Sequence, residues 1–226
     1  MRRSKAGMEQ RPTRAGAVVC ALLALAPPTL AAAAPCGGPF AFTAMSGGGA
    51  KQQHSRAKSR KGGAALTRDP AAHALHELAV EFVGARACRI TASFMPLPAS
   101  TDLKEWANAT LQLPGCGSGT HRTASVDSGE VVVGVQACTD AKTGQLQGLR
   151  LRGASLVDGK LGKPSDDPEA LADASIAPAS CTAGRWHDAV TCPAGQLAIG
   201  LRAGHDGKGY TGLALECAPP DACAAR

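Results

Sequence analysis

The stretch Gly129-Glu-Val-Val-Val-Gly-Val-Gln-Ala137 recurs in the chain as Gly195-Gln-Leu-Ala-Ile-Gly-Leu-Arg-Ala203. Two glycines and the final alanine coincide, and in both copies every second residue is apolar, which is the period of a half-buried β-strand. After a loop, each copy continues with a second such segment, Gln147-Gly-Leu-Arg-Leu-Arg152 and Thr211-Gly-Leu-Ala-Leu-Glu216. The repeat therefore predicts two antiparallel hairpins of strand, loop and strand.

A different spacing precedes the first copy. The apolar residues Leu75, Leu78, Ala79 and Phe82 are spaced as on one face of a helix. They follow Asp69-Pro70, which places an N-cap residue before a proline at the first helical position. We therefore expect one short N-terminal helix in an otherwise β-rich chain.

The expected helix carries His73, His76 and Glu77, a set of side chains that can bind a metal ion. The zinc-protease pattern on a helix, however, has histidines four residues apart with a glutamate after the first. Neither the spacing nor the order matches here. We expect solvent-facing histidines and no metal site.

The second copy contains the residues that point to a family. These are Trp186, Cys192-Pro-Ala-Gly, Gly200-Leu and Gly209-Tyr-Thr-Gly-Leu-Ala-Leu-Glu-Cys217, and together they resemble a unit of the vitelline membrane outer layer protein family. In that family and in the related jacalin-type lectins, three Greek-key sheets form a prism about a pseudo-threefold axis. The resemblance implies an all-β, disulfide-stapled fold of β-prism-like antiparallel repeats.

Two departures from the family pattern leave other all-β folds open. Only two clear copies are present where a prism needs three, and the first copy lacks both the Cys-Pro-x-Gly opening and the closing cysteine. A different β-sandwich or barrel is the alternative.

The N-terminal part has the composition of an export signal. Residues 1–33 begin with basic side chains and continue with an apolar run, Ala15–Leu25, that is too short to span a bilayer. Small residues at Ala31 and Ala33 suit a signal peptidase, so cleavage is expected near Ala33. We expect a secreted, extracellular protein with no membrane span after cleavage.

The next segment, residues 34–68, is rich in Gly, Ala, Ser, Lys and Arg and holds no acidic residue. This composition predicts a basic disordered linker, with the β-rich domain at 69–226 and its repeat at 129–152 and 195–216. An acid-free stretch behind a signal peptide is also typical of a bipartite plastid leader. Plastid and periplasmic destinations therefore remain alternatives.

Cysteine usage agrees with export. Of nine cysteines, Cys20 lies in the signal segment, and the eight that remain suggest four disulfides. Cys192 and Cys217 are expected at strand ends brought alongside by a hairpin, where a disulfide would add about 3 kcal/mol. Pairing of Cys116 with Cys138 is expected next, because it would staple the first copy in a similar way.

The net charge of +6 is unevenly distributed. Residues 1–68 hold eleven of the 24 basic side chains and a single acid, Glu9, whereas the rest of the chain holds 13 basic against 17 acidic side chains. The acidic remainder has no basic face interleaved with aromatic residues, so a nucleic-acid partner is not expected.

Two groups of residues are candidates for carbohydrate binding. Jacalin-type lectins use a Gly-x-x-x-Asp loop whose backbone amides and aspartate hold sugar hydroxyls, and Gly184-Arg-Trp-His-Asp188 fits that spacing. Trp186 is a candidate to stack on a sugar face, and His187 lies beside it. The second group, His205, Asp206 and Tyr210, lies on the loop of the second hairpin.

These candidates support a non-enzymatic protein that binds a glycan or another extracellular matrix or coat component, with no cofactor. An alternative is a glycan-acting hydrolase that uses a carboxylate pair such as Asp188 and Asp206. Another alternative is a purely structural coat protein without a binding site. Asn108-Ala-Thr110 is an acceptor for N-glycosylation if the source is eukaryotic.

Overall fold

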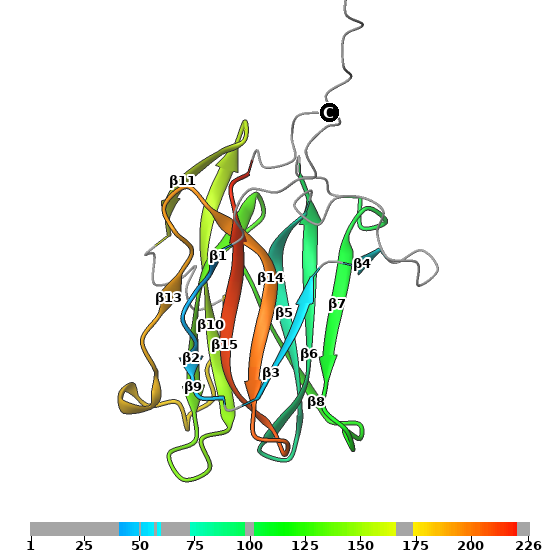
Figure 1. Ribbon diagram of the computed structural model, residues 1–226, viewed down its shortest axis with the longest axis vertical. Helices are drawn as coiled ribbons and strands as arrows, with labels where there is room; N and C mark the ends of the chain where they lie inside the picture. The colour runs from blue at the N-terminus through cyan, green and yellow to red at the C-terminus, as the bar shows by residue number, and fades with distance from the viewer. Residues whose placement is uncertain are drawn as a thin grey trace, which may run out of the picture. The chain divides into compact units, whose positions relative to one another are not determined.

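The computed structural model describes residues 41–49, 51–56, 58–59, 73–97, 102–165 and 174–220. In these ranges the strands form three antiparallel sheets, each of five strands (Figure 1). Residues 1–33, where the signal peptide is predicted, lie outside the described ranges. Within those ranges, no helix is long and apolar enough to cross a membrane.

Each sheet is built on one long hairpin and is named here after it. The β5–β6 sheet contains β4 (Lys58–Ser59), β5 (His73–Val83), β6 (Arg86–Pro96), β7 (Ala107–Gln112) and β8 (Thr120–Ser125). The β9–β10 sheet contains β9 (Glu130–Thr139), β10 (Leu146–Val157), β11 (Lys160–Pro164), β12 (Ser175–Ile176) and β13 (Val190–Thr191). The β14–β15 sheet contains β1 (Ala41–Phe42), β2 (Ser46–Gly47), β3 (Lys51–Arg56), β14 (Leu197–His205) and β15 (Tyr210–Ala218).

The three sheets share one plan. The first strand of each hairpin, β5, β9 or β14, is flanked by a single strand, namely β8, β13 or β3. The second strand of each hairpin pairs on its other side with β7, with β11 and β12, or with β1 and β2. This threefold plan confirms the predicted all-β fold of β-prism-like repeats, and β5–β6 supplies the third hairpin that the sequence repeat does not reveal.

The inner faces of the three sheets form the core. Leu78, Leu149 and Leu213, one from each hairpin, are fully buried in the same apolar cluster. Burying a side chain of this size contributes about 1.5–3 kcal/mol. Because strand residues alternate between faces, the strand period read from the sequence selects Leu149 and Leu213 as inner positions and leaves the polar residues beside them on the outer faces.

The predicted N-terminal helix is wrong, because His73–Val83 is strand β5. The register between β5 and β6 shifts between Leu75 and Glu77, as at a β-bulge, and shifts again between Glu81 and Phe82. A bulge adds one residue to a strand and so changes which side chains face inward. As a result Leu75 and Leu78, three residues apart, are both fully buried, which imitates helical spacing.

The predicted disordered linker at 34–68 is also wrong where the structure describes it. Strands β1 and β2 pair with β15, and β3 pairs with β14, so this segment supplies both neighbours of the β14–β15 hairpin. Residues 34–40, 50, 57 and 60–68 lie outside the described ranges. The first described strand therefore begins at Ala41, well before Asp69.

The structure contains three disulfides among its described residues. The predicted Cys192–Cys217 bond is present. The predicted pairing of Cys116 with Cys138 is wrong, since Cys116 bonds Cys88 and Cys138 bonds Cys181. The Cys88–Cys116 bond ties β6 to a later loop, and the Cys138–Cys181 bond ties β9 to a later loop. A Cys116–Cys138 bond would instead have joined two neighbouring sheets. Cys36 and Cys223 lie outside the described residues.

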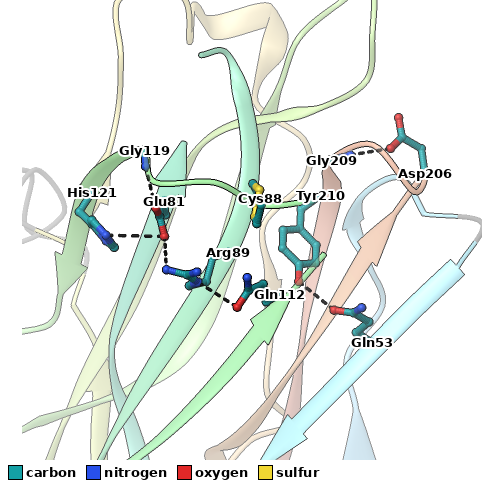
Figure 2. Close-up of a disulfide and its surroundings, with 11 residues drawn as sticks. Gln53, Glu81, Cys88, Arg89, Gln112, Gly119, His121, Asp206, Gly209 and Tyr210 are labelled. Atoms are coloured by element: carbon teal, nitrogen blue, oxygen red, sulfur yellow. Dashed lines mark hydrogen bonds and ion pairs between the residues drawn. A yellow bond between two sulfur atoms is a disulfide. The ribbon is translucent and has the colours of Figure 1, made fainter. Parts of the chain in front are cut away.

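Two buried polar groups are satisfied between strands, as Figure 2 shows. Tyr210 is fully buried, and its hydroxyl donates a hydrogen bond of 2.8 Å to Gln53 on β3. Glu81 on β5, with 2% of its surface exposed, accepts hydrogen bonds from Arg89 on β6 and from the backbone N–H of Gly119. Such groups are tolerated in a core only when they have partners.

Candidate functional site

The segment between β12 and β14 crosses the outer face of the β9–β10 sheet. It is joined to β9 by the Cys138–Cys181 disulfide, by an isolated β-bridge between Cys138 and Trp186, and by the pairing of β13 with β9. A short 3-10 turn, Ala183–Arg185, precedes Trp186. The loop containing residues 184–188 is therefore held on a rigid sheet, which is how binding loops are usually presented.

The side chain of Trp186 packs against the residues around this loop and helps to hold it in place. Its side chain is half-buried, and the indole N–H donates a hydrogen bond of 3.1 Å to the carbonyl oxygen of Cys181. The guanidinium of Arg150, on β10, lies 4.1 Å from the centre of the ring, as in a cation–π contact. That face of the ring is therefore covered by Arg150, so the contacts of Trp186 are those of a packing residue.

His187 and Asp188 follow Trp186 and have exposed side chains. Their backbone is fixed, because the N–H of His187 bonds the carbonyl of Ala137 at 2.9 Å and the carbonyl of Asp188 accepts a 2.9 Å hydrogen bond from Ser46. The His187 ring nitrogen Nε2 shares a hydrogen bond of 2.7 Å with the Thr139 hydroxyl. The loop thus offers one oriented imidazole and one exposed carboxylate.

The second candidate cluster lies on the β14–β15 turn. Asp206 is exposed, and its carboxylate accepts a hydrogen bond of 2.7 Å from the backbone N–H of Lys208 and one of 2.8 Å from that of Gly209, the second of which is drawn in Figure 2. Slight burial acts to raise the pKa of Asp206, but these hydrogen bonds outweigh it and hold that pKa below its ordinary value. Asp206 stays ionised and shapes its own turn.

Tyr210 is not available to a ligand, which corrects its assignment as a binding residue. The side chain is fully buried and bonded to Gln53, so it belongs to the core. His205 is half-buried, and its ring meets that of Tyr210 edge to face, with centroids 6.4 Å apart. Of this cluster, Asp206 alone has an exposed side chain.

The β9–β10 turn lies next to both candidate groups. Asp140, at its start, forms an ion pair of 3.5 Å with Arg185, and Gln145, at its end, donates a hydrogen bond of 3.4 Å to Asp206. Hydrogen bonds from the backbone N–H groups of Thr143 and Lys142 lower the pKa of Asp140. The structure thus brings the two sequence-predicted groups to opposite sides of one turn at the lower end of Figure 1.

Several residues that hold the loop were not found from the sequence. Gln136 donates a hydrogen bond of 2.7 Å to the carbonyl of His187, and Ser46 bonds both Asp188 and the backbone N–H of Ala137. Gln136 had a signal, since it is an outward-facing polar residue of the repeat. Ser46 had none, because it lies in the segment that was expected to be a linker.

The other sequence candidates lie away from this loop. His73 is buried and bonds the carbonyl of Glu105 at 3.2 Å, and His76 bonds the carbonyl of Glu130 at 3.1 Å. The structure thus places neither histidine on a solvent-facing helix. In the described part of the chain, no group of three or more His, Cys, Asp or Glu side chains is placed to hold a metal ion. Asn108 is half-buried on β7, and its glycosylation stays a prediction.

Comparisons with known proteins return structures only. No protein-family model matches the sequence, and no curated protein matches it. The agglutinin of Calystegia sepium is 9% identical, with a TM-score of 0.43 over 79% of this chain and 96% of that chain. A single-chain recombinant jacalin is 11% identical, with a TM-score of 0.47 over 80% and 95% of the two chains. A mannose-binding jacalin-related lectin from Ananas comosus is 10% identical, with a TM-score of 0.39 over 80% and 98%.

Proposed function

We propose that this chain is an exported, non-enzymatic carbohydrate-binding protein. The observation that carries the proposal is the loop of residues 184–188, which presents exposed polar side chains and is fixed to the β9–β10 sheet by a disulfide and by backbone hydrogen bonds. A sugar offers many hydroxyls, and a preorganised set of donors and acceptors binds them without the cost of ordering a flexible loop. Asp188 and His187 are the residues assigned to contact the ligand.

The geometry does not support the alternative of a glycan hydrolase. Such an enzyme needs one carboxyl group with a raised pKa, so that it is protonated and acts as a general acid. The pKa of Asp206 is lowered, and its carboxylate is bound to its own turn. Among the described contacts, none joins Asp206 to Asp188.

A glycan array probed with the exported protein tests the proposal. Asp188→Asn is the test variant, because the side chain of Asp188 is exposed and its contact with Ser46 uses only the backbone carbonyl. The matched control is Asp158→Asn, at the exposed turn beyond β10, where φ is 49° and asparagine is tolerated. We expect at least about a tenfold loss of glycan affinity for Asp188→Asn and none for the control.

Two outcomes would contradict the proposal. If the unmodified protein binds no glycan on the array, the result argues against carbohydrate binding. Self-association of that protein would then favour a coat component. Equal glycan affinity in the Asp188→Asn variant and the unmodified protein would remove the loop from the binding surface.

A further inference from the structure

Beside the candidate loop, the outer face of the β9–β10 sheet is hollowed. The pocket has a volume of about 210 Å³ and lies between β9, β10 and β13, with Gln136, Arg150, Arg152, Ala189 and Thr191 around Gly134. Pockets for drug-sized ligands measure about 300–1,000 Å³. This pocket therefore suits one functional group with part of a sugar ring, and not a whole oligosaccharide.

Gly134 lines the pocket at a point where neighbouring side chains leave no room for a Cβ atom. It pairs with Arg152 on one side and with Thr191 on the other. A Cβ atom at position 134 would lie 3.0 Å from Cγ2 of Thr191 and 3.2 Å from Cβ of Arg152, closer than such atoms normally approach. Any larger residue here would push these side chains apart or fill the hollow.

The equivalent position in the β14–β15 sheet shows what normally occupies such a hollow. The repeat aligns Gly134 with Gly200 and Arg152 with Glu216. A Cβ at position 200 would lie 2.6 Å from Oε2 of Glu216, so the carboxylate of this fully buried residue takes the space above the glycine. His54 on β3 pairs with that carboxylate at 2.8 Å.

The β9–β10 sheet has different residues at the same places. Arg152 stands where the other sheet has Glu216, and Ala189, just before β13, stands where the other sheet has His54. The β9–β10 sheet therefore has the cationic Arg152 in place of a carboxylate, and the methyl group of Ala189 in place of an imidazole ring. In the β14–β15 sheet the glycine is thus covered by a carboxylate bonded to His54, whereas in the β9–β10 sheet the pocket beside the glycine is lined by arginine side chains.

The two arginines give the pocket a defined chemistry. Arg150 and Arg152 are both half-buried, and stacking on Trp186 at 4.1 Å fixes the plane of the Arg150 guanidinium. No carboxylate forms an ion pair with Arg150 among the described residues. A planar, preoriented guanidinium binds a carboxylate or sulfate through paired hydrogen bonds, more strongly than in open water because the site is partly desolvated.

We infer that the pocket at Gly134 holds the negatively charged group, a carboxylate or a sulfate, of an acidic saccharide whose remainder contacts the neighbouring loop. This inference rests on the proposed carbohydrate-binding function and specifies its ligand class. Arg150 binds the charged oxygens, Arg152 adds positive charge at the rim of the pocket, and Thr191, with an exposed side chain, adds a hydroxyl. The proximity of Ala189 and Thr191 to Asp188 along the chain makes the pocket and the loop one continuous surface.

The experiment measures the affinity of the exported protein for galactose, galacturonate, galactose 6-sulfate and inorganic sulfate by titration calorimetry. A charge-assisted hydrogen bond contributes about 1.5–3 kcal/mol, so the better of the two acidic sugars is expected to bind about ten- to a hundredfold tighter than galactose. Raised salt should reduce this preference. Tighter binding of galacturonate would identify a carboxylate ligand, and tighter binding of galactose 6-sulfate would identify a sulfate ligand.

Three variants locate the preference. Arg150→Gln and Gly134→Val are each expected to bring the affinity for the acidic sugar down to that for galactose. Arg122→Gln is the matched control, because Arg122 also lies over an aromatic ring, that of Phe82 at 5.8 Å, but on the β5–β6 sheet. Its affinities should not change, and the thermal unfolding midpoint confirms that each variant is folded.

The possible failures can be told apart. Equal affinity for galactose and both acidic sugars overturns the inference and leaves the proposed function standing. A preference that survives both Arg150→Gln and Gly134→Val overturns the assigned pocket. Inorganic sulfate that binds as tightly as the sulfated sugar overturns the saccharide assignment. Binding of none of these sugars overturns the inference, and only the binding of no glycan on the array argues against the proposed function itself.

Discussion

Tyr210 is the only tyrosine of the chain, so its replacement by phenylalanine and its titration can both be followed without interference. Tyr210→Phe removes the hydroxyl that donates to Gln53 and leaves the ring in the core. A hydrogen bond of this kind contributes about 1 kcal/mol net, so the variant should be less stable than the parent by about that amount at neutral pH. Urea unfolding followed by tryptophan fluorescence measures the difference.

The sign of this difference should reverse at alkaline pH. Burial raises the pKa of Tyr210 well above its ordinary value of 10.0. The unfolded chain therefore releases the phenolic proton at a pH where the folded chain retains it, and the parent loses stability above pH 10 by up to about 1.4 kcal/mol per pH unit. The variant has no such proton, so the two stability curves should cross between about pH 10 and 11.

The absorbance of the phenolate provides the decisive check. In the folded protein it should be absent near pH 10 and develop only with unfolding. A native protein whose tyrosine ionises with an ordinary pKa would refute the burial argument. Loss of glycan binding in Tyr210→Phe, without loss of stability, would instead return Tyr210 to the binding surface.

Three further predictions concern the fold. A chain that begins at Ala34 should unfold cooperatively, whereas a chain that begins at Asp69 lacks β1 to β4 and should show no cooperative unfolding. A cooperative transition in the shorter chain would restore the linker hypothesis. Glu81→Gln should lower the unfolding free energy by about 2 kcal/mol, because a charged acceptor of Arg89 is lost, and an unchanged urea midpoint would contradict this. Peptide mapping without reduction should recover the described pairs Cys88–Cys116, Cys138–Cys181 and Cys192–Cys217, and a peptide that links Cys116 to Cys138 would contradict this connectivity.

The sequence predicted the β9–β10 and β14–β15 hairpins and missed the β5–β6 hairpin, although the strand register shifts within all three. In β14 the large apolar residues Leu197, Ile199 and Leu201 still fall at every second position of the sequence, so the strand period can be recognised even though the register with β15 shifts between Ala198 and Gly200. In β5 the bulge after Leu75 changes the phase and suggests a helix instead. Periodicity alone does not distinguish a bulged strand from a short amphipathic helix, because the pairing that resolves them is made with a distant strand.

Composition also misled the interpretation of the N-terminal strands. The segment around β3 is basic and polar, yet Gln53 and His54 reach Tyr210 and Glu216 across the sheet. Its order depends on partners more than 150 residues away in the sequence, and no local pattern reveals them. The same dependence explains the candidate site, where the Gly184–Asp188 spacing identified the loop but gave no indication of Gln136, Ser46 or the two arginines beside it.

The most direct test of the central claim is a nuclear magnetic resonance titration of the isotope-labelled exported protein with the saccharide that binds best on the array. We predict that the amide signals of residues 184–191 and of the facing segment of β9 shift in proportion to occupancy, while those of the β5–β6 sheet remain in place. Shifts confined to another sheet, or no shifts with any saccharide, would contradict the claim that this loop binds carbohydrate.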